Sequence, residues 1–201
     1  MTDITRRIRN DHPVWPGDTP YSFELVSRIT QGDSVNIGKI TTTTHLGTHL
    51  DAPYHYQESG GKLESVPLST LIGPCRMVDA RGQSVLDASF IKSLGDLPER
   101  VLFYSGQPNN WDTFPKEFMS VSPAAVEALA AAGVKLFGTD APSVDTLNSK
   151  DLPGHKAFAK AGIYIVEGLA LAQIKPGDYG LIVLPLRLEG ADASPVRAIL
   201  R

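Results

Sequence analysis

The sequence of 201 residues is poor in cysteine, in long apolar runs and in excess positive charge. Cys75 is the only cysteine, which excludes an internal disulfide and a metal site built from several thiolates. No stretch of about 18 consecutive apolar residues occurs, which argues against a membrane-spanning helix. Lys and Arg total 19 against 22 for Asp and Glu, a balance that predicts no nucleic-acid partner. Any metal ion must therefore be held by His, Asp or Glu.

The N-terminal segment 1–7 carries charge, but no apolar stretch of the length that a secretory signal needs follows it. We therefore expect a soluble, cytoplasmic protein that has no membrane partner. The length fits one compact domain over residues 1–201, because a chain of this size can bury a substantial apolar core.

Short segments with strand patterns are spread along the whole chain. They lie at 21–29, 35–44, 76–80, 101–105, 134–138, 163–166 and 181–186. Several of them are apolar on both faces, which predicts a sheet in the core of the protein.

One helix is predicted over 124–132, between Ser122 as N-cap with Pro123 at the first helical position and Gly133 as the stop. A second helix is predicted over 87–94. The helix at 124–132 leads directly into an apolar strand segment, as in a β-α-β unit, whereas the N-terminal third has strand patterns alone. Together these patterns predict an α/β fold with a mixed sheet.

The most informative stretch is 41–55, in which three of the five histidines and one carboxylate fall within eleven residues. His45, His49, Asp51 and His55 follow the spacing His-x3-His-x-Asp-x3-His. Neutral imidazoles and a carboxylate suit zinc or another first-row divalent ion, and a carboxylate has two oxygens with which to bridge two metals. Polar loop residues with Asp51 capping a turn are the alternative, but the convergence of several ligand types favours a metal site.

A helix would bring His45 and His49 together, but four preceding threonines, Gly47 and Pro53 all disfavour a helix here. A strand that runs into a loop is the better interpretation. In an extended chain, the odd positions 45, 49, 51 and 55 project to one side and can converge on one site. Gly47 would then remove a side chain that otherwise crowds these ligands.

Two further residues have both a structural and a functional interpretation, and two more have a structural one alone. Glu167 ends an apolar strand segment, and it is either a metal ligand or a buried ion-pair partner, since a buried carboxylate is costly unless paired. His155 is expected at the surface from its residue type alone. Trp15 lies among turn residues, where it can stack on an aromatic ligand or pack in the core. Cys75 is expected to be inert packing.

The block from His45 to His55 resembles the signature His-x-Gly-Thr-His-x-Asp-x-Pro-x-His of the cyclase-like metal-dependent hydrolases. This family includes bacterial kynurenine formamidase and isatin hydrolase. Segments that resemble the formamidase branch lie at 14–20, 66–68, 73–76, 133–136, 176–179 and 192–198. The resemblance implies a single domain with a swivelling β/β/α fold, assembled as a homodimer or a higher homo-oligomer.

The resemblance also implies a site with two zinc ions, with manganese or another divalent ion as the alternative. His45, His49 and Asp51 would bind the first zinc, and Asp51 would also reach the second. His155 would bind the second zinc, and Glu167 would contact both.

The activity that the resemblance implies is hydrolysis of a small aromatic amide, N-formylkynurenine, with His55 as the acid–base residue and Trp15 against the substrate. Hydrolysis of isatin or of another small cyclic amide on the same site is the nearest alternative. A non-catalytic metal-binding module is the alternative from another class. His55 separates these classes, because a catalytic site keeps an acid–base group beside an open metal position.

Overall fold

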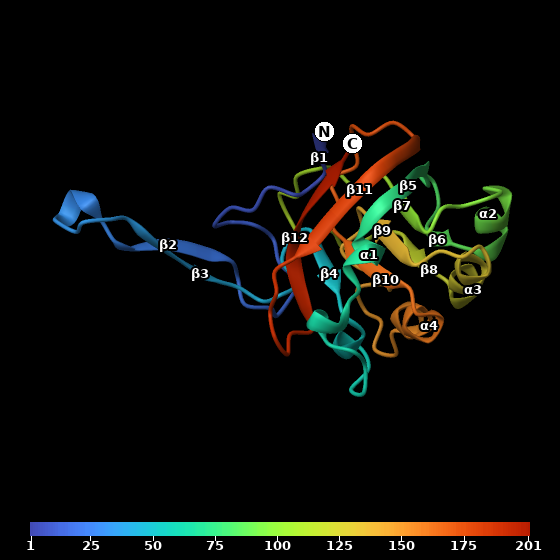
Figure 1. The fold of residues 1–201 in the computed structure, drawn as a ribbon, viewed down its shortest axis with the longest axis horizontal. Coiled ribbons are helices and arrows are strands. Elements are labelled where there is room, and N and C mark those ends of the chain that lie inside the picture. The colour runs from blue at the N-terminus through green and yellow to red at the C-terminus, as the bar shows by residue number, and fades with distance from the viewer.

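The computed structural model describes all of residues 1–201 as a mixed α/β fold (Figure 1). The strands are β1 (Thr2–Asp3), β2 (Ser22–Ser27), β3 (Ile37–Thr41), β4 (His49–Asp51), β5 (Ile72–Asp79), β6 (Val85–Leu86), β7 (Arg100–Tyr104), β8 (Ser120–Val121), β9 (Leu136–Thr139), β10 (Tyr164–Glu167), β11 (Gly177–Pro185) and β12 (Ala193–Leu200). The helices are α1 (Leu68–Leu71), α2 (Ala88–Ser93), α3 (Pro123–Ala131) and α4 (Pro153–Ala161). None of these helices has the length and apolar character that crossing a bilayer requires.

Seven strands close into a barrel-like sheet in the order β12-β11-β5-β7-β9-β10-β4, because β4 also pairs with β12. The neighbours β5, β7, β9 and β10 run parallel, whereas β4, β11 and β12 pair with their neighbours in antiparallel fashion. β1 adds to the outer edge of β12, and β6 pairs with β8 in a small separate sheet. The predicted α/β class with a mixed sheet is confirmed.

Alternating side chains of the barrel strands build two apolar cores, since successive residues of a strand point to opposite faces. On β7, Leu102 faces the inside of the barrel, and Val101 and Phe103 face outward. Phe103 stacks on Phe137 of β9, which in turn contacts Phe158 of α4. The outer core thus lies between the parallel strands and the helices α2, α3 and α4, which cover this side of the barrel (Figure 1).

The local sequence signals predict seven strands, and the two helices in the middle of the chain, correctly. All seven predicted strands are present, although most of their ends differ by a few residues. α3 begins at Pro123, and the Ser122 hydroxyl accepts a hydrogen bond from the backbone of Ala125, as the N-cap prediction requires. α2 occupies the second predicted helix and is capped by Asp87.

The sequence patterns predict neither α4 nor β12. β12 contains Pro195, which usually argues against a strand, but Pro195 lies opposite His49 in a pairing that stays intact around it. α4 opens with Pro153 and Gly154, which are typical of a turn, yet its buried face packs into the outer core through Phe158. Tertiary packing outweighs local propensity in both elements.

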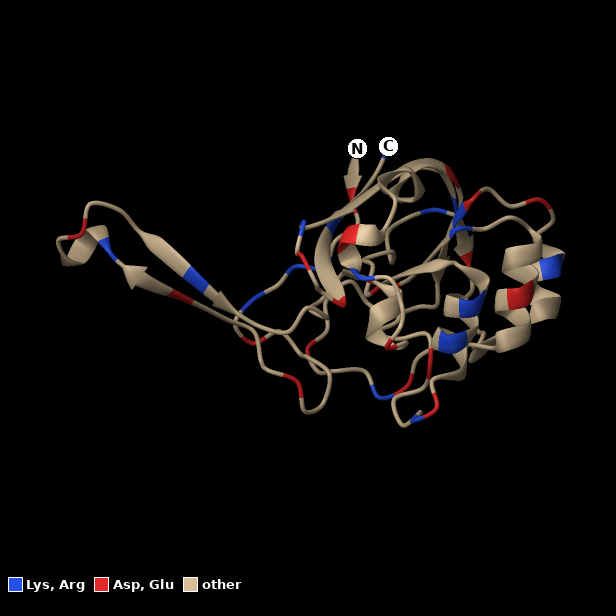
Figure 2. Ribbon diagram, turned by 60° about the horizontal axis from the view of Figure 1, so that its bottom comes forward, with Lys and Arg blue, Asp and Glu red and all other residues tan.

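Residues 21–43, called the arm below, form a hairpin that extends away from the barrel (Figures 1 and 2). Its strands β2 and β3 pair only with each other. None of residues 21–43 is buried, so the arm belongs to neither apolar core.

Candidate active site

The short strand β4 places two of the predicted ligands on the outer face of the barrel. Leu50 points into the inner core, so its neighbours His49 and Asp51 point the opposite way. β4 pairs with β10, and His49 lies directly opposite Glu167 in this pairing. Val166 points into the same inner core, which turns the Glu167 side chain to the outer face with the two ligands of β4.

The prediction of an extended chain from residue 45 to residue 55 is wrong outside β4. The chain turns at Gly47, whose φ is +60°, and forms a 3₁₀ turn over Pro53–His55. A side chain at Gly47 would lie near Ile8 and His12 rather than among the ligands, so Gly47 serves the turn and does not relieve crowding. The histidines converge all the same, because the two turns direct them back toward β4.

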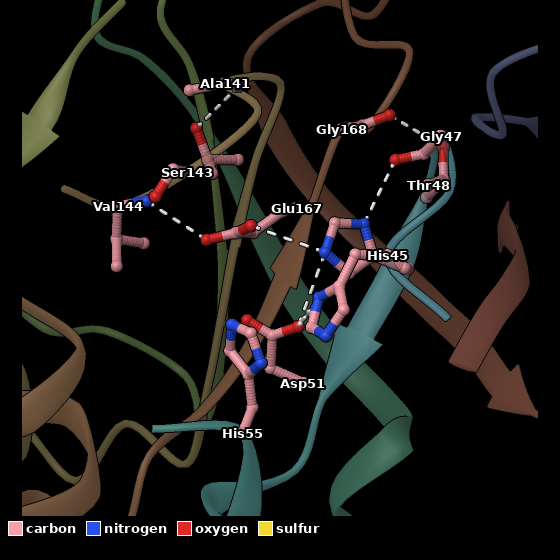
Figure 3. Close-up of polar contacts among 12 residues, drawn as sticks. His45, Gly47, Thr48, Asp51, His55, Ala141, Ser143, Val144, Glu167 and Gly168 are labelled. Atoms are coloured by element: carbon pink, nitrogen blue, oxygen red, sulfur yellow. Dashed lines mark hydrogen bonds and ion pairs between the residues drawn. The ribbon is translucent and has the colours of Figure 1, made fainter. Parts of the chain in front are cut away.

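All predicted ligands meet in one cluster, of which Figure 3 shows His45, Asp51 and Glu167. His45 Nδ1 lies 3.2 Å and His49 Nε2 lies 3.3 Å from Asp51 Oδ1. His49 Nε2 is also 3.4 Å from Glu167 Oε2. His155 Nε2 lies 3.5 Å from Glu167 Oε1 and 3.8 Å from Asp51 Oδ2. Three imidazoles therefore each direct one ring nitrogen at Asp51, and two of them direct it at Glu167 as well.

The central atoms of the cluster lack hydrogen bonds although they are fully buried. His49 Nε2 and both carboxylate oxygens of Asp51 have no partner in hydrogen-bond geometry. Buried charged groups without partners are costly, and a cation among them removes that cost. Ligand atoms of His45, Asp51 and His55 lie within 4.8 Å of one another, and these residues form one set of three. His49, Asp51 and Glu167 form a second set by the same distance. The donor set thus fits a divalent metal ion, with Asp51 common to both sets.

The opposite ring nitrogen of each of the three histidines is held by an acceptor outside the cluster. The bonds run from His45 Nε2 to Asp192 Oδ2 (3.0 Å), from His49 Nδ1 to the Gly47 carbonyl (3.2 Å) and from His155 Nδ1 to Asp145 Oδ2 (2.8 Å). Metal-binding histidines in proteins are oriented by such outer acceptors, which also fix the tautomer.

Two of these acceptors, Asp145 and Asp192, were not among the residues singled out from the sequence. Asp145 accepts hydrogen bonds from the backbone of Gly154 and His155, at the start of α4, as well as from the His155 ring. This contact explains why His155 is only 3% exposed, and the expectation of a surface position is wrong. The sequence holds a faint signal for Asp192 alone, because it opens the segment 192–198 that resembles the formamidase branch.

Charges within the cluster shift the pKa values of its members in opposite directions. Burial lowers the pKa of His45, but the neighbouring Asp192 and Asp51 outweigh burial and raise it to about 9. Burial also opposes the charge on His49, whose pKa the two central carboxylates raise to about 10. Asp51 is buried as well, yet the surrounding imidazoles hold its pKa well below the usual range. His55 differs, because burial keeps its pKa below the ordinary value.

The cluster forms one wall of a pocket of about 350 Å³, a size typical of small-molecule sites. Trp15, Trp111 and Phe114 line the same pocket. Trp15 contacts Phe114 edge to face, with ring centroids 5.4 Å apart. Trp15 therefore lines the same pocket as the histidine and carboxylate cluster and is not a core residue. Trp111 and Phe114 have no recognisable signal in the sequence and become visible only in the fold.

Comparison with known proteins shows to which family this chain belongs. Residues 2–146 match the family model described as "Putative cyclase". The chain belongs to the cyclase family. It is 42% identical over 201 residues to the kynurenine formamidase of Geobacillus thermodenitrificans, covering 99% of this chain and 96% of that relative. It is 44% identical over 208 residues to the kynurenine formamidase of Erythrobacter litoralis, covering 99% of this chain and 92% of that relative.

Solved structures with the same fold agree with this family. A potential metal-dependent hydrolase with cyclase activity superimposes with a TM-score of 0.85 at 31% identity, covering 99% of this chain and 96% of the other. Isatin hydrolase A from Labrenzia aggregata reaches a TM-score of 0.84 at 22% identity, with 99% and 92% covered, which shows a shared fold. The predicted resemblance and the fold class are confirmed. This cyclase-family chain is a hydrolase, which leaves a non-catalytic metal-binding module without support.

Proposed function

We propose that this protein hydrolyses N-formyl-L-kynurenine to L-kynurenine and formate, a step of tryptophan degradation through the kynurenine pathway. The observation that carries the proposal is the buried cluster of three imidazoles and two carboxylates that opens into a pocket with aromatic walls. The two kynurenine formamidases that are 42% and 44% identical over nearly the whole chain support the substrate. We take residues 1–201 as one catalytic domain; the cytoplasmic location stays a prediction.

We further propose that the cluster holds two zinc ions. His45, His49 and Asp51 would bind the first ion, Asp51 and His155 would bind the second, and Glu167 would contact both, with manganese or another divalent ion as the alternative. The bridging position of Asp51 and its unpartnered oxygens support this division. When bound, divalent ions supply what the side chains here lack, a nucleophile from water at neutral pH and a Lewis acid for the carbonyl oxygen.

His55 is the proposed acid–base residue. Its ring lies beside His45, with centroids 3.9 Å apart, and its Nδ1 is 3.5 Å from Asp192 Oδ2. About a third of the His55 side chain is exposed, whereas that of His49 is almost fully buried, so His55 is the more accessible to a molecule in the pocket. There it delivers a proton to the aryl nitrogen as the bond to the formyl carbon breaks.

Trp15, Trp111 and Phe114 would receive the aromatic ring of the substrate. Offset and edge-to-face contacts between aromatic rings are worth about 0.5–1.5 kcal/mol each beyond the area they bury. These three rings line the same pocket as the ligand cluster, so a substrate ring that they hold would have its formamide group within the pocket that His55 and Glu167 also line.

Isatin hydrolysis is the second candidate, because the isatin hydrolases share this fold over nearly the whole chain. The test is to incubate purified, zinc-loaded protein with N-formylkynurenine and, separately, with isatin, and to follow each reaction by absorbance. We expect turnover of N-formylkynurenine with kcat/KM at least about a hundredfold above that for isatin. A preference for isatin would overturn the proposed substrate.

The roles of the histidines are separable by measuring metal content alongside kinetics. His55→Ala should lower kcat by about 10²–10⁴-fold, the usual contribution of a general acid–base, while zinc content stays near that of the parent. His49→Ala should lose zinc and activity together. If His55→Ala also empties the site, His55 is a ligand, as its place in one of the two ligand sets allows, and the acid–base role is wrong.

A further inference from the structure

The pocket has one carboxylate that the ligand cluster does not use. Of the Asp, Glu, Lys and Arg residues that line it, Glu167 belongs to the cluster and Asp18 does not. Asp18 forms no ion pair with a Lys or Arg side chain. Its one side-chain partner is the Thr43 hydroxyl, which donates a hydrogen bond of 3.3 Å to Oδ2. A carboxylate accepts about four hydrogen bonds, so Asp18 keeps acceptor sites for a molecule in the pocket.

A tight turn keeps this carboxylate close to the indole of Trp15. The backbone of Asp18 donates a hydrogen bond of 2.9 Å to the Trp15 carbonyl, which closes a turn of four residues. Pro16 and Gly17 hold the two central positions, and Gly17 has a φ of +99°, as the third residue of a type II turn requires. Proline and glycine in this order favour that single turn geometry. An aromatic side chain and a carboxylate thus enter the pocket at a fixed spacing.

This pair suits a ligand that joins an aromatic ring to a cation through a short link. The ring can pack against Trp15, and an ammonium group offers three N–H donors and the charge opposite to that of Asp18. N-formylkynurenine has this build, because only a ketone carbon and a methylene separate its aryl ring from the carbon that carries the ammonium group. Both ends of such a ligand can therefore be held by one turn.

We propose that Asp18 forms a subsite for a primary ammonium group, next to the place where Trp15 contacts the aromatic ring of the ligand. This inference rests on the proposed function and adds to it the residue that selects the amino-acid part of the substrate. Hydrogen bonds between two charged groups are stronger than neutral ones, and the loss of one should lower affinity by about tenfold or more.

A purely structural role for Asp18 would depend on the Thr43 hydroxyl. Their separation of 3.3 Å is long, because hydrogen bonds from a hydroxyl to a carboxylate usually measure about 2.5–2.7 Å. In Asp18→Asn, the amide has nearly the same shape and keeps an oxygen that can accept this bond. The substitution therefore removes the negative charge and preserves the contact at the base of the arm.

The test uses three formanilides that differ only in the amino-acid part. N-formyl-L-kynurenine has both the ammonium and the carboxylate group, and its α-carboxamide keeps only the ammonium. The third compound, 4-(2-formamidophenyl)-4-oxobutanoate, keeps only the carboxylate. Hydrolysis of each is followed by absorbance with zinc-loaded protein, and kcat/KM is compared among the three.

The parent should prefer both ammonium compounds over the oxobutanoate by at least about tenfold. Asp18→Asn should lower this preference about tenfold, for the carboxamide as much as for N-formylkynurenine, and leave zinc content near that of the parent. Asp151→Asn is the matched control, because it removes the same charge from an exposed position outside the pocket. Its preference should equal that of the parent.

A second pair of variants tests the turn. Gly17→Ala should lower kcat/KM for all three compounds, because a side chain is strained at φ +99° and the spacing of Trp15 and Asp18 changes. Gly32→Ala in the arm is matched, with φ +96° and equally open space around it, and should keep the kinetics of the parent. Unchanged kinetics of Gly17→Ala would refute the role of the turn.

Binding of the products separates this subsite from the proposed reaction. Isothermal titration calorimetry should show that Asp18→Asn binds L-kynurenine about tenfold more weakly, with no such loss for 4-(2-aminophenyl)-4-oxobutanoate. An equal loss for both products, or an unchanged affinity for L-kynurenine, would overturn the ammonium subsite. A parent that shows the expected binding but hydrolyses none of the formanilides would instead refute the proposed function and leave the subsite standing.

Discussion

Asp145 offers the sharpest test of how the site is held, because it touches the cluster only through His155. Its Oδ2 accepts a hydrogen bond of 2.8 Å from the His155 ring, which leaves Nε2 free to face Asp51 and Glu167. In Asp145→Asn, the amide keeps one acceptor but places a donor near two backbone N–H groups and the ring. Loss of such an outer partner typically costs 10–100-fold in metal affinity, or about 1.4–2.7 kcal/mol.

The assay is competition for zinc with a chromophoric chelator, together with thermal unfolding. Asp140→Asn is the matched control: Asp140 is buried and accepts hydrogen bonds from the backbone of Ser105, Gly106 and Gln107, but it contacts no histidine of the site. Both variants should unfold at lower temperature, and only Asp145→Asn should bind zinc more weakly. Equal zinc affinity in all three proteins would refute the idea that Asp145 orients a ligand.

Three further predictions follow from the same geometry. Trp15→Ala should reduce turnover of N-formylkynurenine much more than zinc content; a loss of zinc instead would make Trp15 a structural residue. Gly168→Ala should lower the free energy of unfolding by at least about 2 kcal/mol, because the backbone has φ +65° and the new methyl would collide with the Gly47 carbonyl. Gly162→Ala, with φ +66° but open space around it, should cost clearly less by the same chemical denaturation. Burial raises the pKa of the Cys75 thiol from 9.0 to about 12. At pH 8 the fraction of Cys75 present as thiolate should therefore be roughly a thousandfold lower in the native protein than in the unfolded chain. Thiol reagents should modify the native protein more slowly by about the same factor.

The sequence predicts those elements that local physical chemistry determines. The Ser122 cap with Pro123 and the run of alanines specify α3 without help from the rest of the chain. The apolar segments around β7 and β10 are strands for the same reason, since both of their faces are buried. The ligand block is also recognisable, because three imidazoles and a carboxylate at such close spacing are typical of a metal site.

The remainder depends on contacts between distant residues. His155 is buried because Asp145 and the outer core hold α4 in place, and neither contact is visible in the sequence around His155. The aromatic wall likewise joins Trp15 to Phe114, about a hundred positions apart in the chain. The strand pattern of the arm is present in the sequence, but its separation from the barrel appears only in the fold.

Metal dependence of N-formylkynurenine hydrolysis tests the central claim most directly. The protein is exhaustively chelated, its zinc content is measured, and turnover is followed by absorbance before and after zinc is added back. The ligand cluster predicts that turnover falls to the background rate in the metal-free protein and returns with zinc. Full activity in protein shown to be free of metal would contradict it.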